Sequence, residues 1–171
     1  MPTIVPNRFP TIPPPPDCRL AVVGEAPGED EETIAQPFVG HSGKLLIDTL
    51  GKTGIATNRI FIGNVCQLRP PGNDITKFDF DGPEIQGGLQ RLRKDLSVFR
   101  PNCVLLLGRT AFRAARPDLC YHTKKGIHVP LTDWRGSIFP SPEWDGLKCV
   151  GTYHTARSIT ISQGAFGIRT N

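Results

Sequence analysis

Residues Leu20–Gly28 read LAVVGEAPG, an aliphatic run that ends in a turn rich in glycine and proline. A short apolar run bounded by turn-forming residues, such as Leu20–Val23, is typical of a strand buried on both faces of a sheet. Three more runs of this kind follow, at residues 60–65, 103–107 and 148–152. The sequence therefore predicts a buried sheet of largely parallel strands.

Helical patterns lie between these runs. The clearest covers residues 84–99, where apolar residues recur at steps of four, three, four and three from Ile85 to Phe99. Residues 42–50 and 110–115 show shorter patterns of the same kind. This alternation predicts the α/β class, as a three-layer α/β/α sandwich with a central, mostly parallel four-stranded sheet. In such folds ligands bind beyond the carboxyl ends of the strands.

The length of 171 residues, with 38% hydrophobic and 21% charged residues, is that of one folded domain. Five prolines between Pro10 and Pro16 exclude a helix there, so we expect an extended arm at residues 1–17 and a single domain at 18–171. No run approaches the ~18 apolar residues of a membrane helix, and the N-terminus lacks the apolar core of a signal peptide. We expect an intracellular protein, in the cytoplasm or at the nucleoid.

The charge and the cysteines limit the partners. The net charge is +4, and the acids gather at residues 25–32, which leaves the rest of the chain more basic than the total suggests. This balance permits a polyanionic partner without requiring one. The five cysteines form no Cys-x-x-Cys pair. An odd, scattered set of this kind predicts neither a disulfide framework nor a zinc site.

Each predicted strand is followed by a motif that carries polar groups. The motifs are Gly24–Asp30 (GEAPGED), with Gln36–Gly43 (QPFVGHSG) after it, Asn64–Asn73 (NVCQLRPPGN), Leu107–Ala111 (LGRTA) and Gly151–Ala156 (GTYHTA). Taken singly, each has a simple structural explanation as a turn, a core phenylalanine, a strand-end cap or a loop histidine. Five of them in order, all at strand ends, indicate one binding site.

This set of motifs resembles the uracil-DNA glycosylase superfamily, and most closely its family 4, the iron–sulfur type. The resemblance spans roughly residues 20–157. It implies an enzyme that flips uracil out of DNA and hydrolyses its N-glycosidic bond, which leaves an abasic site. The partner is then uracil-containing DNA, single- or double-stranded, and the protein is expected to act as a monomer.

Two departures from the family pattern are visible. The family's cluster cysteines are missing, since Leu68 and Gly88 or its neighbours stand where two of them are expected and only Cys18 precedes the first motif. A [4Fe–4S] cluster needs its thiolates, so we predict neither a metal nor another cofactor. Thr155 stands where the family has a proline after the motif histidine.

The resemblance assigns the chemistry to a few side chains. Glu25 would stabilise positive charge on the sugar and orient water, and His154 would donate a hydrogen bond to uracil O2 as the base leaves. Asn64 would read uracil, since its amide offers the donor and acceptor that match O4 and N3–H. Phe38 would stack on the base. The remaining substrate-binding residues are Gly24, Ala26 and, as the group that excludes thymine, Glu31.

Contacts to the DNA backbone are expected from residues that can hold phosphate without reading sequence. They are Ser42, Arg69, Pro70, Pro71, Gly72, Asn73, Arg109 and Arg157. Arg157 follows the histidine motif and is also the candidate for the gap that the flipped base leaves.

Three alternatives remain open from sequence. The first is a catalytically weak uracil- or DNA-binding protein on the same fold. The second is an α/β enzyme that binds a small nucleotide, and the third is a covalent-trapping relative of the glycosylases. The lost cysteines and Thr155 favour the first, and Glu25, Asn64 and His154 oppose it. Ala26 argues against the third, which carries glutamine in the first motif and a basic insert that this chain lacks.

Overall fold

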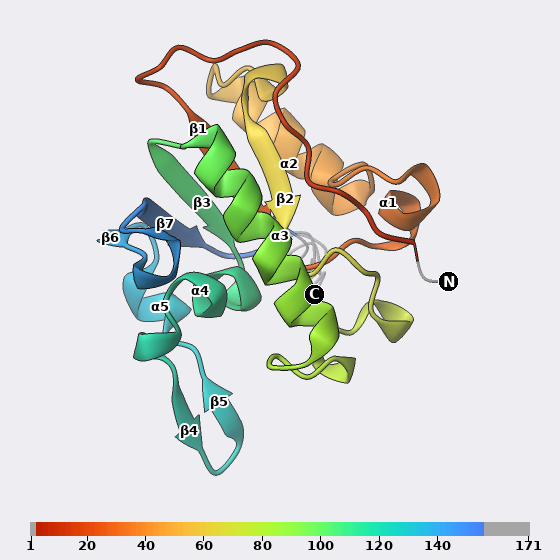
Figure 1. Cartoon of the computed structure of the whole chain (residues 1–171), viewed down its shortest axis with the longest axis vertical. Helices are drawn as coiled ribbons and strands as arrows, with labels where there is room; N and C mark the ends of the chain where they lie inside the picture. The colour runs from red at the N-terminus through yellow and green to blue at the C-terminus, as the bar shows by residue number, and fades with distance from the viewer. Residues whose placement is uncertain (1–2, 156–171) are drawn as a thin grey trace, which may run out of the picture.

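The computed structural model describes residues 3–155 and contains a central sheet with strand order β2-β1-β3-β7-β6 (Figure 1). Its strands are β1 (Leu20–Gly24), β2 (Phe61–Asn64), β3 (Cys103–Leu107), β6 (Ile138–Pro140) and β7 (Lys148–Thr152). The four predicted strands are confirmed, and they are parallel to one another. The predicted count of four is wrong, because β6 pairs antiparallel with β7 and extends the sheet to five strands.

The register of the parallel strands brings their carboxyl ends together. Gly24 pairs with Asn64 across β1 and β2, and Leu107 pairs with Thr152 across β3 and β7. Every motif singled out in the sequence after a strand therefore starts at the same edge of the sheet.

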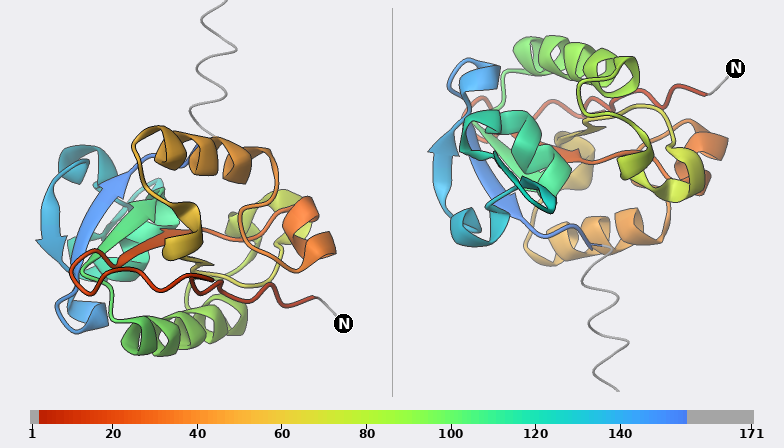
Figure 2. Two further views of the ribbon diagram at one scale, coloured as in Figure 1. Left: turned by 90° about the horizontal axis from the view of Figure 1, so that it is seen from above. Right: turned by 90° about the horizontal axis from the view of Figure 1, so that it is seen from below.

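Helices cover both faces of the sheet, which confirms the sandwich (Figure 2). The helices are α1 (Glu29–Ile34), α2 (His41–Lys52), α3 (Pro83–Phe99), α4 (Arg109–Ala115) and α5 (Leu131–Trp134). Short 3-10 turns lie at η1 (Thr57–Arg59), η2 (Pro71–Asn73), η3 (Ile75–Lys77), η4 (Pro117–Leu119) and η5 (Pro142–Trp144). No helix within residues 3–155 is long and apolar enough to span a membrane.

Alternate residues of the strands supply the two cores. Ala21 and Val23 of β1 pack with α3 and α4 on one face, whereas Val22 packs with α2 on the other. Because successive side chains of a strand point to opposite faces, both halves of the run must be apolar. This explains why the strand sequences are continuous apolar runs without alternation.

The helix α3 lies very close to the backbone that follows β2. A Cβ added at Gly88 would stand 2.2 Å from the Val65 carbonyl oxygen, so only glycine allows this approach. On the same helix, Leu89, Leu92 and Leu96 are buried against the sheet, as their spacing predicts.

The N-terminal arm pairs with the free edge of β2 (Figure 1). The backbone of Arg8 exchanges two hydrogen bonds with Ile62, at 2.7 and 2.9 Å, and Val5 is buried. The side chain of Asn7 accepts a hydrogen bond from the backbone N–H of Asn64 and donates one to Asp95. The arm thereby covers an edge whose backbone groups would otherwise lack partners.

Several elements were not predicted. They are β6, the helices α1 and α5, and a hairpin of β4 (Tyr121–Thr123) and β5 (Gly126–His128) that projects from the body of the molecule in Figure 1. The strand β6 is three residues long, ends in proline and leaves Ile138 72% exposed. Such a segment is too short to show the continuous apolar run that marks the central strands.

Candidate active site

A cavity of about 470 Å³ opens at the carboxyl edge of the sheet. It brings together side chains from four of the five motifs and from the start of α2. The predicted site residues that line it are Glu25, Ala26, Glu31, Phe38, Ser42, Asn64, Pro70, Asn73 and His154.

Gly24 lies under two of these side chains. A Cβ at this position would be 2.5 Å from Phe38 Cζ and 2.6 Å from Asn64 Oδ1. Both distances are far below the ~3.5–4.0 Å of an ordinary carbon contact. Gly24 therefore contributes to the site by lacking a side chain, which lets the Phe38 ring and the Asn64 amide both lie against its backbone.

Phe38 is packed against two elements, β1 at Gly24 and α2 at Gly43. Its ring is 8% exposed and its φ is 60°, in the left-handed region. The helix α2 approaches its backbone so closely that a Cβ at Gly43 would be 2.2 Å from the Phe38 carbonyl oxygen. Holding a bulky residue in this unfavourable conformation needs such surrounding contacts, and it fixes the ring over the cavity.

Asn64 ends β2 and is 4% exposed. Its backbone N–H donates to Asn7 of the arm, at 3.2 Å. The residue that we expect to read the base is therefore anchored through its main chain, while its amide oxygen lies beside Gly24.

The charge of Glu25 acts on the imidazole of His154. Burial lowers the pKa of His154 below its ordinary value of 6.5, and the negative charge of Glu25 partly opposes this shift. The imidazole is therefore held neutral at neutral pH, as a hydrogen-bond donor to an anion requires. A hydrogen bond from Thr110 Oγ1 to Glu25 Oε2 orients the carboxylate.

Glu31 joins the two loops that form the mouth of the cavity. Its carboxylate accepts hydrogen bonds from the backbone N–H groups of Gly28, at 3.1 Å, and Gly40, at 2.7 Å. With one oxygen on each loop, the side chain is fixed in place at the cavity wall.

The residues expected to contact DNA divide into two groups. Ser42, Pro70 and Asn73 line the cavity mouth, and Pro71 and Gly72 lie beside them on the exposed turn η2. Arg69 is already paired, since its guanidinium contacts Glu32 at 3.3 Å and Glu29 at 3.2 Å. Its charge is thus largely balanced by α1.

The other two arginines lie elsewhere. Arg109 begins α4, is exposed, and donates a hydrogen bond to the carbonyl of Ile127 in the hairpin, at 3.3 Å. It lines a second cavity and not the first. Arg157 lies outside the described residues 3–155.

The resemblance expects a cluster cysteine at Leu68, and the structure shows what surrounds this position. Cys18 precedes the amino end of β1, whereas Leu68 follows the carboxyl end of β2, so the two positions lie at opposite edges of the sheet. Leu68 packs against the apolar core and its backbone pairs with Ile4 of the arm. Burial raises the pKa of Cys149 to about 12, which keeps this thiol protonated. Within residues 3–155 no group of His, Cys, Asp and Glu could hold a metal.

Sequence reasoning missed two residues of the site. Thr110 was noted only as part of the Leu107–Ala111 motif, yet it is the residue that contacts Glu25. Gly108 has a φ of 89°, and a Cβ there would be 3.2 Å from His154 Cβ, so it makes room for the histidine. The glycine–threonine pair directly after a strand end was the available signal for both.

Comparisons with known proteins show the family of this chain. The profile of the family described as the uracil DNA glycosylase superfamily matches residues 10–163. A type-4 uracil-DNA glycosylase of Archaeoglobus fulgidus is 33% identical over 142 residues, which is 81% of this chain and 66% of the relative. One from Thermotoga maritima is 33% identical over 139 residues, 81% of this chain and 65% of the relative. The chain thus spans slightly less than two thirds of these relatives.

Proposed function

Because this chain belongs to the uracil-DNA glycosylase superfamily, we propose that it excises uracil from DNA by hydrolysing the N-glycosidic bond. The observation that carries the proposal is a single cavity lined by an amide, an aromatic ring, an imidazole and a carboxylate: Asn64, Phe38, His154 and Glu25. These are the four groups that base recognition, stacking, leaving-group stabilisation and sugar-cation stabilisation require. The partner in this proposal is uracil-containing DNA. The protein acts on it inside the cell, as a monomer.

Asn64 selects the base. Its amide pairs with uracil O4 and N3–H, whereas cytosine presents the opposite pattern and leaves both amide groups without a matching partner. Since the residue is 4% exposed, such a mismatch would not be repaired by solvent. Unsatisfied buried polar groups cost ~1–3 kcal/mol each.

Phe38 provides the stacking surface for a base that has been rotated out of the helix. Base–aromatic stacking contributes ~1–3 kcal/mol per base. This energy offsets part of the cost of unstacking and unpairing. The ring can act in this way because Gly24 and Gly43 fix its position before the base arrives.

His154 and Glu25 act on the charges that develop as the bond breaks. The neutral imidazole donates a hydrogen bond to the uracil anion, and the carboxylate stabilises the cationic sugar and orients the attacking water. Both groups interact most strongly with the transition state, so both accelerate cleavage more than they strengthen binding.

Glu31 excludes thymine in this proposal. A wall fixed by two backbone hydrogen bonds cannot move aside for the extra methyl group at C5. Gly24 and Ala26 complete the substrate pocket by leaving room for the base.

The DNA backbone is held at the mouth of the cavity. Ser42 and Asn73 offer polar groups to phosphate, beside the first turn of α2, whose N-cap Gly40 makes no side-chain cap. Pro70, Pro71 and Gly72 shape the loop that carries Asn73. We assign Arg69 to holding this loop against α1, and Arg109 and Arg157 to phosphate contacts.

Thr155 retains the restraint that the family's proline would give. Its hydroxyl donates a hydrogen bond to the carbonyl oxygen of Ser42, at 3.0 Å, and so ties the histidine loop to α2. This contact favours an active enzyme over a protein that only binds uracil or DNA.

Single-turnover cleavage of a uracil-containing oligonucleotide tests the proposal. Strand breakage at the resulting abasic site, in both single- and double-stranded DNA, is expected from the parent protein and not from His154→Ala or Glu25→Ala. Both variants should still bind DNA that carries an abasic-site analogue. Binding without cleavage by the parent would instead establish the catalytically weak alternative.

A further inference from the structure

The β4–β5 hairpin is a stiff, exposed projection. Tyr121 pairs with His128 across the two strands, and their rings are 4.7 Å apart. At the turn, the hydroxyl of Thr123 donates to the Gly126 carbonyl at 2.7 Å and accepts from the Lys125 N–H at 3.2 Å. These contacts hold the tip in one shape although residues 121–126 are all exposed.

The hairpin is also basic. Residues 119–132 contain Lys124, Lys125 and two histidines but no Asp or Glu. Both lysines stand at the tip, where no carboxylate of the hairpin itself can pair with them. A rigid cationic projection of this kind is a feature that a polyanion would recognise.

The hairpin lies on the active-site side of the molecule. A second cavity, of about 670 Å³, extends from Glu25 and Thr110 to His122 and Ile127 of the hairpin. Glu25 lines both cavities, so the second cavity adjoins the base pocket and extends toward the hairpin. Arg109 lines the second cavity and contacts the hairpin through its hydrogen bond to the Ile127 carbonyl.

The second cavity does not suit a phosphate along its whole length. Asp79 and Asp81 also line the second cavity, and their carboxylates would repel an anion. The favourable positions for phosphate are therefore on the hairpin side, at Arg109 and at the two lysines of the tip.

We propose that the β4–β5 hairpin binds the phosphate backbone of the DNA beside the flipped nucleotide, through Lys124 and Lys125. The inference rests on the proposed function and extends its footprint. From Tyr121 to Lys124 a strand advances roughly 10 Å at ~3.3 Å per residue. At ~3.4 Å per nucleotide of one strand this equals about three nucleotides, so the contacts fall on DNA that flanks the lesion.

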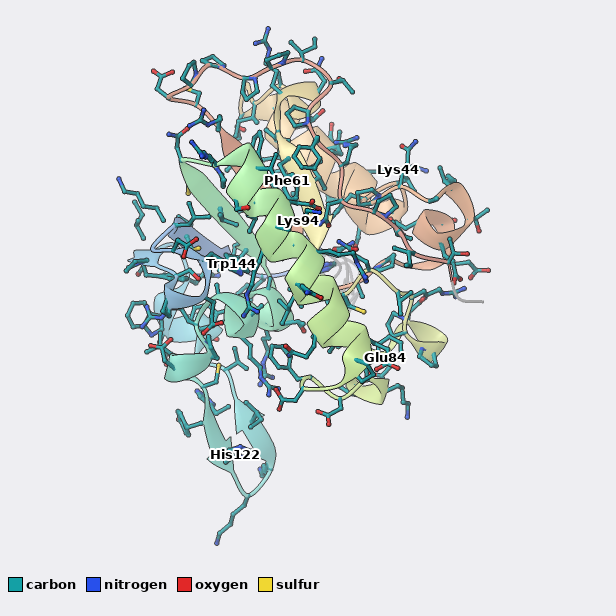
Figure 3. All side chains as sticks on the ribbon, in the orientation of Figure 1. Lys44, Phe61, Glu84, Lys94, His122 and Trp144 are labelled. Atoms are coloured by element: carbon teal, nitrogen blue, oxygen red, sulfur yellow. The ribbon has the colours of Figure 1, made fainter. Side chains whose placement is uncertain are left out.

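The test compares two charge-matched double variants. Lys124→Gln/Lys125→Gln removes the tip charges, and Lys94→Gln/Lys148→Gln removes two lysines from α3 and from the amino end of β7. Figure 3 shows Lys94 on α3, in a different part of the molecule from His122 on the hairpin. A third variant, Lys124→Arg/Lys125→Arg, keeps the charge.

The measurement is the salt dependence of Kd for a long duplex with one abasic-site analogue. The hairpin glutamine variant should reduce the log–log slope by about two, at ~0.9 per phosphate contact, while the arginine variant and the α3/β7 control keep the parent slope. Cleavage of a short uracil oligonucleotide that ends beside the lesion should be unchanged in all of them. Equal slopes for the two glutamine variants would overturn the proposal. A parent that cleaves no uracil substrate would refute the proposed function separately.

Discussion

Replacing Gly24 with alanine should impair catalysis far more than it impairs folding. The added methyl group would stand 2.5 Å from Phe38 Cζ and 2.6 Å from Asn64 Oδ1, so each must move by about 1 Å to restore an ordinary contact. Phe38 cannot retreat freely, because α2 presses on its backbone at Gly43. A displacement of ~1 Å in a positioning group costs about 100-fold in rate, and overpacking costs ~1–3 kcal/mol in stability. Single-turnover uracil excision and thermal unfolding measure the two effects.

Gly51 provides the matched control for this substitution. It lies in α2, and a Cβ there meets nothing within 4 Å. Gly51→Ala should excise uracil at the parent rate and gain up to ~1 kcal/mol of stability from helix propensity. If folded Gly24→Ala protein excises uracil within a few-fold of the parent, the close approach of the ring and amide to β1 does not govern the reaction.

Four further expectations follow from the same geometry. Thr110→Val should lower kcat by roughly tenfold or more without weakening abasic-DNA binding, since a hydrogen bond to a charged group contributes ~1.5–3 kcal/mol, and Thr110→Ser should recover most of the rate. His154 should titrate below pH 6.5 by NMR, so the cleavage rate should not change with the protonation of His154 above that pH. As pH falls, His154 binds a proton in the unfolded chain at a higher pH than in the folded protein. The free energy of unfolding should therefore decrease as pH falls through 6.5, and His154→Asn should remove this pH dependence. Asn64→Asp should shift preference from uracil toward cytosine, and an unchanged ratio of the two excision rates would contradict its role. Anaerobically purified protein should show no stoichiometric iron by elemental analysis, because Leu68 stands where the resemblance expects a cluster cysteine.

The central strands and the location of the site were predictable because their signals are local. A buried parallel strand must be apolar on both faces, so residues 20–23 and 103–107 can be recognised without knowledge of their neighbours. The rule that ligands bind at carboxyl ends then placed the motifs together. The hairpin had no such signal, since residues 121–126 are all exposed and nothing in their pattern requires burial.

The roles of individual charges were less predictable, because they depend on partners far along the chain. Arg69 was expected to meet phosphate from its place in a basic loop, yet Glu32 and Glu29, 37 and 40 residues away, already pair with it. Glu31 was expected only to face the base, yet its oxygens join Gly28 to Gly40.

Glu25 and His154, the proposed catalytic pair, also depend on partners far along the chain. The orientation of Glu25 depends on a hydroxyl 85 residues away, and the pKa of His154 is set by its burial and, in the opposite direction, by Glu25. Removing Glu25 would therefore take away two effects at once: the proposed stabilisation of the sugar by the carboxylate and the charge that partly raises the histidine pKa. Glu25→Gln should lower the pKa of His154 further, so that the imidazole stays neutral to lower pH while cleavage is lost. An NMR titration of His154 in the parent and in Glu25→Gln separates the two effects. A histidine pKa that does not fall in Glu25→Gln would mean that the two groups do not interact.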